Sequence, residues 1–227
     1  MSQLALLWHL HQPQYSDPRT GRPIMPWTRL HALRGYRDML VESAELELPV
    51  TINVVPSLVD QLLWYAGGGG DEHLDLTRIP AGQLNPEQLA TIRGTFPAGH
   101  RAMADAYGPW AALRRRVESG VSLTLGMVLD LQVWSTLQWF GATALRDFPE
   151  LGELRAKGVG FTESDKIAVL DAQDGVLRGI PDQLRAFAAC DATCLSTSPY
   201  YHPILPLLVD VRHARRCMPG LPLDFQF

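Results

Sequence analysis

The chain has 227 residues and a net charge of −4, with 46% hydrophobic and 19% charged residues. This balance is typical of a folded globular protein and excludes a disordered one. No block of Lys and Arg interleaves with aromatic residues, so the usual electrostatic footprint of a nucleic-acid-binding protein is missing. The first apolar run, Leu4 to Leu10, is too short for a membrane span or a signal peptide, which predicts a cytoplasmic protein without a membrane partner.

The same run from Leu4 to Leu10 predicts the first strand, because a nearly continuous apolar stretch is typical of strands buried on both faces in a parallel sheet. Trp8 alternates away from His9 along this strand and is expected in the core. Residues 11–27 are rich in Pro, Gly and Asp and predict a loop. Apolar residues at helical spacing then predict a helix over Trp27 to Glu45.

A β-branched run from Pro49 to Val55 predicts the second strand. Ser57 is expected to cap the next helix, Leu58 to Tyr65. The glycines at 67–70 predict a break in the chain. Residues 71–189 predict a mainly helical region.

Within that helical region, Asn85 to Glu87 and Thr162 to Asp165 are signals for helix starts. Leu125 to Phe140 is a strongly apolar segment that carries Trp134 and Trp139. We expect both tryptophans in the core, because aromatic residues in an apolar helical run pack inside more often than they form a binding platform.

Ala192 to Ser196 predicts a third strand, and Ile204 to Arg216 a further helix. The order strand, helix, strand, helical excursion, strand and helix favours an α/β fold with parallel strands and right-handed crossovers. Three strands cannot close a barrel, since small barrels need about eight. The sequence therefore predicts either an open sheet or an unfinished barrel.

His9 and His11 are two residues apart, so they point to the same face where the first strand meets its loop. This position is the carboxyl end of a parallel strand, where α/β folds keep their sites, and Gln12 adds an amide. Three interpretations compete: hydrogen-bonded core histidines, a metal pair of the amidohydrolase type, and a pair that binds sugar hydroxyls. A metal site needs later ligands, for which His202 and His213 are the candidates. The spacing alone does not choose among them.

The segment from His9 to Tyr15 resembles the first signature of glycoside hydrolase family 57. Further segments resemble that family in the same order along the chain: Leu30 to Tyr36, Asn53 to Leu62, Asp130 to Trp134, Gly160 to Asp165, and Ser196 to Pro206. The resemblance covers nearly the whole chain. It therefore favours the sugar-binding interpretation of the histidine pair.

The resemblance implies an enzyme that hydrolyses or transfers α-1,4-glucan units with retention of configuration. On this hypothesis the fold is α/β, and residues 1–227 are the N-terminal part of an incomplete (β/α)7 barrel with parallel strands. A large, mainly helical insertion is expected at about 57–189, with the C-terminal remainder of the barrel absent. In the family the nucleophilic Glu and the acid Asp come later, so they are expected beyond Phe227. No catalytic residue is assigned here, and the chain alone is expected to be inactive.

The resemblance also predicts the substrate-binding residues, which are His9, His11, Gln12, Trp27, Tyr201 and His202. Gln12 is expected to hold the tautomer of a histidine or to bind sugar itself. Burial at the helix start is the alternative for Trp27, and support of other residues is the alternative for His202. Four acids near the motifs are expected to be helix caps or solvated charges, namely Asp17, Asp130, Glu163 and Asp210.

The expected partner is an α-1,4-glucan or a maltooligosaccharide, with no nucleic acid, no metal and no cofactor. An open barrel edge further predicts self-association or a C-terminal partner chain. Two other functions stay open: a glucan-binding or partner-complemented module without turnover, and a metal-dependent amidohydrolase-like enzyme.

Overall fold

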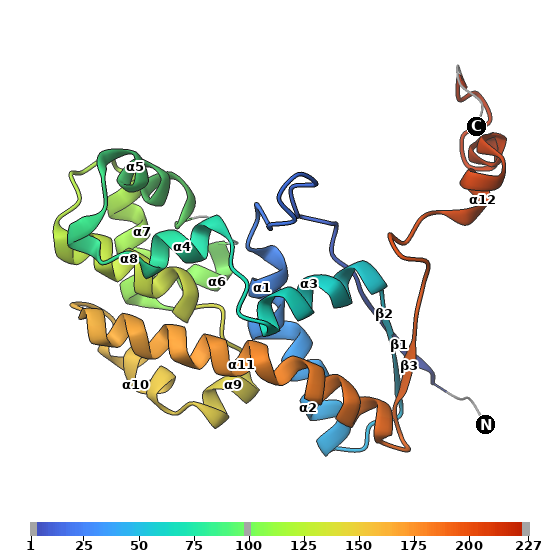
Figure 1. Ribbon diagram of the computed structural model, residues 1–227, viewed down its shortest axis with the longest axis horizontal. Helices are drawn as coiled ribbons and strands as arrows, with labels where there is room; N and C mark the ends of the chain where they lie inside the picture. The colour runs from blue at the N-terminus through green and yellow to red at the C-terminus, as the bar shows by residue number, and fades with distance from the viewer. Residues whose placement is uncertain (1–3, 98–100, 224–227) are drawn as a thin grey trace.

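The computed structural model describes residues 4–97 and 101–223 (Figure 1). The strands are β1 (Leu6–Leu10), β2 (Val50–Val54) and β3 (Cys194–Ser196). The helices are α1 (Trp27–His31), the π-helical η1 (Ala32–Tyr36), α2 (Arg37–Glu45), α3 (Pro56–Ala66), α4 (Glu72–Arg78), the 3-10 helix η2 (Ala81–Gln83), α5 (Pro86–Thr95), α6 (Arg101–Asp105), α7 (Gly108–Glu118), α8 (Leu125–Leu137), α9 (Ala142–Asp147), α10 (Glu150–Lys157), α11 (Glu163–Ala189), α12 (Leu205–Val209) and the 3-10 helix η3 (Val211–Arg216). The first and last residues of the predicted domain, 1–3 and 224–227, lie outside the described residues.

The described residues form a parallel sheet of three strands in the order β1-β2-β3. Its register places His9 opposite Asn53, and Asn53 opposite Ser196. The chain crosses from β1 to β2 through α1, η1 and α2, and from β2 to β3 through the long helical region. The predicted α/β class with parallel strands is therefore confirmed, and the carboxyl ends of all three strands meet at one edge.

The first strand is not buried on both faces as its apolar run predicts. Leu7 is 68% exposed and Trp8 53% exposed, whereas Leu10 at the end of the strand is buried. The prediction of Trp8 in the core is therefore wrong. β1 pairs with β2 alone among the described strands, and a parallel strand is buried only when other layers cover both its faces.

The helix starts predicted in the helical region are confirmed. The side chain of Asn85 accepts from the backbone N–H of Gln88, and Gln88 caps Asn85 in return. Thr162 and Asp165 form the same reciprocal arrangement at the start of α11. These pairs satisfy the backbone donors that a helix leaves free at its first turn. Within residues 4–97 and 101–223, no helix has both the length and the apolar composition to cross a bilayer.

Helix α8 is the centre of the hydrophobic core. Every residue from Met127 to Leu137 is buried, as expected for a helix that is mainly apolar, and four of these residues are polar: Asp130, Gln132, Ser135 and Thr136. Trp134 is 1% exposed and Trp139 4% exposed, so both tryptophans are core residues as predicted. The long helix α11 packs against α8 and also against α2 and α3, which joins the helical region to the sheet (Figure 1).

Two local predictions near the strand ends are wrong. Helix α3 begins at Pro56, with Val55 as the capping residue and no side-chain cap, because proline favours the first helical position. Ser57 is buried inside the first turn, and its backbone N–H donates to the carbonyl of Tyr200. The helix predicted over Ile204 to Arg216 is split at Asp210, whose backbone is extended (φ −154°, ψ 109°) and whose side chain caps η3.

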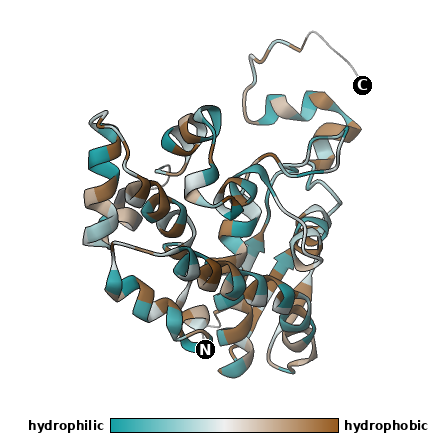
Figure 2. Ribbon diagram, turned by 60° about the vertical axis from the view of Figure 1, so that its left-hand side comes forward, coloured by the Kyte–Doolittle hydropathy of each residue, from teal (hydrophilic) through white to brown (hydrophobic). Residues whose placement is uncertain are grey.

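Helix α12 stands apart from the body of the molecule (Figure 1). None of its residues is buried, and its apolar side chains are open to solvent, including Leu205, Leu208 and Val209. Figure 2 shows hydrophobic segments both among the packed helices and on these short helices near the C-terminus. The end of the described chain therefore presents apolar surface that nothing described covers.

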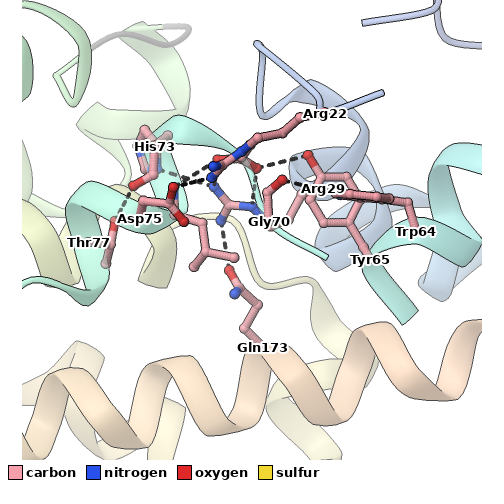
Figure 3. A network of polar contacts seen from close by, with 11 residues as sticks. Arg22, Arg29, Trp64, Tyr65, Gly70, His73, Asp75, Thr77 and Gln173 are labelled. Atoms are coloured by element: carbon pink, nitrogen blue, oxygen red, sulfur yellow. Dashed lines mark hydrogen bonds and ion pairs between the residues drawn. The ribbon is translucent and has the colours of Figure 1, made fainter. Parts of the chain in front are cut away.

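A buried ion pair fastens α1 to the start of α4 (Figure 3). Arg29 and Asp71 are both 0% exposed, and two hydrogen bonds of 2.9 and 3.1 Å join the guanidinium to the carboxylate. Asp71 also accepts from the hydroxyl of Tyr65, and Arg29 also donates to Gln173 on α11 and to Nδ1 of His73. Burial alone raises the pKa of Asp71, but the Arg29 guanidinium outweighs it and keeps that pKa below its ordinary value.

Replacing His73 with Phe is expected to flatten the pH dependence of the free energy of unfolding. Burial and the adjacent Arg29 lower the pKa of His73 to about 3, while an unfolded histidine titrates near 6.5. On acidification from about pH 7.5 to 5.5, only the unfolded state takes up this proton, which costs the folded state about 1.4 kcal/mol. Urea unfolding at both pH values measures the difference, with His213→Phe as the control. Equal pH dependence in His73→Phe and wild type would contradict this account.

Candidate functional site

A row of side chains crosses the carboxyl edge of the sheet. The Nδ1 atom of His9 lies 2.8 Å from Oδ1 of Asn53 on the neighbouring strand. The amide nitrogen of Asn53 donates to the hydroxyl of Ser196 at 3.0 Å, and its oxygen accepts from the hydroxyl of Ser198 at 3.0 Å. Asn53 therefore fixes the position of His9 from β2, with support from the end of β3.

Three histidines converge above this row, and they form the histidine cluster: His9, His11 and His202. The ring centroids of His9 and His202 are 4.4 Å apart, those of His11 and His202 5.3 Å, and those of His9 and His11 5.8 Å. The structure thus brings together the two histidines of the first strand and one that is almost 200 residues later in the chain.

His202 has a left-handed backbone, with φ of +52°. This conformation costs a residue with a side chain of order 1–3 kcal/mol and persists only where the surroundings enforce it. Here the backbone N–H of His202 donates to the carbonyl of Pro199 at 2.7 Å, which closes the turn after β3. The turn directs the imidazole back toward β1.

The surroundings of His11 change its titration. Burial lowers the pKa of His11 below its ordinary value, and the neighbouring His202 and His9 lower it further. Its imidazole is therefore neutral at neutral pH, with one nitrogen that donates and one that accepts. Such a group can bind hydroxyls, which both donate and accept.

The amide of Gln12 is engaged inside the protein. Its nitrogen donates to the hydroxyl of Tyr36 at 2.8 Å, and its oxygen accepts from the hydroxyl of Tyr15 at 2.9 Å. Among the described residues, none of its hydrogen bonds reaches a histidine ring. The prediction that Gln12 fixes the tautomer of a histidine is therefore wrong. That contact comes from Asn53 instead. Gln12 holds the start of the loop next to His11.

Gln61 on α3 anchors the same loop. Its amide nitrogen donates to the carbonyl of Pro13 at 3.1 Å, and its oxygen accepts from the hydroxyl of Thr28 at 3.1 Å and from the backbone N–H of Tyr15 at 3.4 Å. Gln61 is 2% exposed, and a buried amide of this kind is stable because both its ends are paired. The loop that leaves the first strand is thus held at several points.

Tyr201 lies in the turn after β3 and is 62% exposed. Its ring meets that of Tyr200 edge to face, with the centroids 4.6 Å apart. The hydroxyl of Tyr200 is hydrogen-bonded to Asp60 on α3, which raises the pKa of Tyr200 to about 12. The turn that bears His202 is therefore tied to α3, and Tyr201 is left free at the surface.

Trp27 has no aromatic contact with the histidine cluster among the described residues. It is partly exposed and lines a separate cavity of about 270 Å³, together with residues of α4 and α5. The structure thus does not bring Trp27 together with the other predicted site residues, and its predicted role remains a prediction.

All four acids near the motifs have structural partners, but Asp130 is buried within α8 and is neither the helix cap nor the solvated charge that was predicted. The carboxylate of Asp130 accepts from the backbone N–H of Phe161, and Glu163 pairs with the buried Lys166. Asp17 pairs with Arg19 and Asp210 with Arg212, both at the surface. Among residues 4–97 and 101–223, no carboxylate is hydrogen-bonded to a histidine of the cluster. The cluster is therefore a hydrogen-bonding site to which no described carboxylate contributes a hydrogen bond.

Asn53, Ser196 and Ser198 are parts of this site that were not predicted from the sequence. Asn53 had a usable signal, since a polar residue near the carboxyl end of a β-branched run lies where α/β folds keep their sites. Ser198 had none, because its contact with Asn53 depends on the turn after β3. In the part of the chain that the structure describes, no group of three or more His, Cys, Asp or Glu has a geometry suited to a metal ion.

A family model described as glycosyl hydrolase family 57 matches residues 5–218. No curated protein and no solved structure matches the chain. The family match spans the histidine pair, all three strands and His202.

Proposed function

The chain belongs to glycosyl hydrolase family 57, and on that premise we propose that its histidine cluster binds a glucose unit of an α-1,4-glucan. Family membership carries glycoside hydrolase or glucanotransferase activity in general. The observation that supports the α-glucan site is the convergence of His9, His11 and His202 at the carboxyl edge of a parallel sheet. Neutral imidazoles suit sugar hydroxyls, because they donate and accept without requiring an opposite charge.

In this proposal the residues of the edge have different tasks. His11 and His202 contact the hydroxyls of the sugar, and His9 does so in an orientation that Asn53 fixes. Gln12 acts indirectly, through the loop start that it holds with Tyr36 and Tyr15. Tyr201, exposed beside the cluster, is the proposed contact for a neighbouring glucose.

We further propose that the sheet belongs to an incomplete (β/α)7 barrel, with residues 1–227 as its N-terminal part and an insertion at about 57–189. The parallel order β1-β2-β3 and the two crossovers suit this arrangement. The proposed reaction retains configuration, which requires two carboxyl groups about 5–5.5 Å apart. A cytoplasmic location stays a prediction.

Replacing His11 with Ala is expected to weaken the binding of maltoheptaose about fivefold, because one lost hydrogen bond to the sugar is worth about 1 kcal/mol. Titration calorimetry measures this affinity. The control is His213→Ala, a histidine of η3 outside the cluster. Equal weakening by both variants, or none by His11→Ala, would remove the cluster from the glucan site.

The alternative function is a glucan-binding module that a partner polypeptide completes. Two observations favour it: among the described strands β1 pairs on one side only, with Leu7 and Trp8 exposed, and the apolar residues of α12 have no cover among the described residues. Exposed edges and apolar patches of this kind are typical of surfaces that associate. Self-association predicts that the purified chain sediments as an oligomer. A separate C-terminal chain predicts that it sediments as a monomer.

A further inference from the structure

The cavity beside Trp27 is built from two parts of the chain that are distant in sequence. One part of the lining is Ile24 and Met25 of the loop before α1, together with Trp27 at the start of α1. The other part comes from α4 and α5, with Glu72 and Thr91. Its volume is about 270 Å³, slightly below the common range for drug-sized ligands, so it suits a ligand of a single ring.

His73 supplies a hydrogen-bond donor to this cavity. Its ring stacks on Phe96, with the centroids 4.0 Å apart, and lies 5.1 Å from the ring of Trp139. Its Nδ1 lies 3.2 Å from the guanidinium of Arg29, and because Arg29 can only donate, Nδ1 must accept. In a neutral imidazole the proton then sits on Nε2, which has no hydrogen-bond partner among the described residues. His73, a lining residue of the cavity, thus has a ring N–H that no described residue accepts from.

The charges around the cavity disfavour an anionic ligand. Glu72 is exposed and lines the cavity, so its carboxylate repels an anion. The Arg29 guanidinium, which is hydrogen-bonded to His73, has its charge balanced by Asp71, so this pair adds no net charge beside the cavity. A hydroxyl satisfies both polar groups at once, since its oxygen accepts from His73 and its proton can be donated to Glu72.

The apolar part of the cavity suits the face of a sugar ring. Trp27 is partly exposed, and an indole offers a flat surface on which the C–H face of a pyranose can lie. Ile24 and Met25 are 59% and 45% exposed and extend this apolar wall. A ring with one apolar face and hydroxyls at its edge matches the whole lining.

We propose that this cavity is a second glucan site, which binds one neutral pyranose unit between Trp27 and the edge of His73, apart from the histidine cluster. The inference rests on the proposed function for the class of sugar. The loop of residues 11–27 links the two sites, because Gln12 and Tyr15 hold its beginning near the cluster and Trp27 stands at its end. A glucan chain can therefore engage the protein at two separate places.

The experiment follows the indole N–H signals of the isotope-labelled chain by NMR during titration with maltotriose. The signals of Trp27 and Trp139 are expected to shift saturably. Thr91→Leu should abolish these shifts, because it fills the cavity with a residue that favours a helix more than Thr does. Glu72→Gln is expected to weaken binding at this site and to admit glucuronate, which the wild-type cavity should exclude. Glu87→Gln, an acid in the first turn of α5, is the matched control.

The outcomes separate this site from the histidine cluster. Shifts of Trp27 that persist in His11→Ala and disappear in Thr91→Leu support the second site. Maltotriose binding that His11→Ala abolishes, while Trp27 never shifts and Thr91→Leu changes nothing, overturns the second site and leaves the proposed function intact. Shifts of Trp27 with glucuronate as strong as those with maltotriose also overturn it. Shifts of Trp27 alone, with no effect of His11→Ala on affinity, support the cavity and contradict the cluster.

Discussion

Replacing Arg29 with Met is expected to lower the free energy of unfolding by about 3–5 kcal/mol, because it leaves a buried carboxylate without its cation. Arg29 and Asp71 are both fully buried, and the pair joins α1 to α4 by two hydrogen bonds. After the substitution, Asp71 keeps the hydroxyl of Tyr65 and the backbone N–H of Leu74, which do not neutralise its charge. Urea unfolding followed by circular dichroism measures the loss.

The chain offers a matched control in the pair Arg146 and Glu45. This pair also has two hydrogen bonds, of 2.7 and 2.8 Å, but both side chains are about half exposed. Water already solvates exposed charges, so Arg146→Met is expected to cost far less than Arg29→Met. The double variant Arg29→Met with Asp71→Asn should recover part of the loss, since no buried charge remains. Equal costs at Arg29 and Arg146 would show that burial does not decide the energy of this pair.

The second large effect concerns catalysis. The 227-residue chain alone is expected to release no reducing ends from maltoheptaose, whereas ordinary enzymes turn over at about 1–1000 per second. A retaining glycosidase needs a nucleophilic carboxylate and an acid about 5–5.5 Å from it. Among the described residues, no carboxylate is hydrogen-bonded to the cluster, and Asp130 and Glu163 are engaged with structural partners.

A reducing-sugar assay with the purified chain measures this turnover, and His11→Ala identifies its source. Activity at an ordinary glycosidase rate that His11→Ala abolishes would contradict the prediction, because it would place a catalytic acid at the cluster. Activity that His11→Ala leaves unchanged would not arise at the histidine cluster.

Local chemistry could be predicted from the sequence. The capping residues Asn85 and Thr162 act on backbone groups three residues away, so their effect does not depend on the rest of the fold. The pairing of His9 with His11 follows from the period of a strand. The burial of helix α8 follows from its mainly apolar composition.

Features set by distant parts of the chain could not be predicted. The exposure of Trp8 depends on which layers cover β1, and the pattern of the strand itself does not contain this information. The hydrogen bond between Asn53 and His9 depends on the strand register. The break at Asp210 between α12 and η3 depends on where the chain leaves the body of the molecule after β3. Arg29 and Asp71 belong to separate helical segments, and neither residue has a local signal for a buried pair.

The most direct test of the α-glucan site follows the imidazole nitrogen signals of the chain by NMR while maltoheptaose is added. Contact with sugar hydroxyls changes the hydrogen bonds of the imidazole nitrogens, and His213 on η3 serves as the internal reference. The account predicts saturable shifts of His9, His11 and His202 with one common affinity, and no shift of His213. Saturable binding of maltoheptaose that leaves the signals of all three cluster histidines unmoved would contradict it.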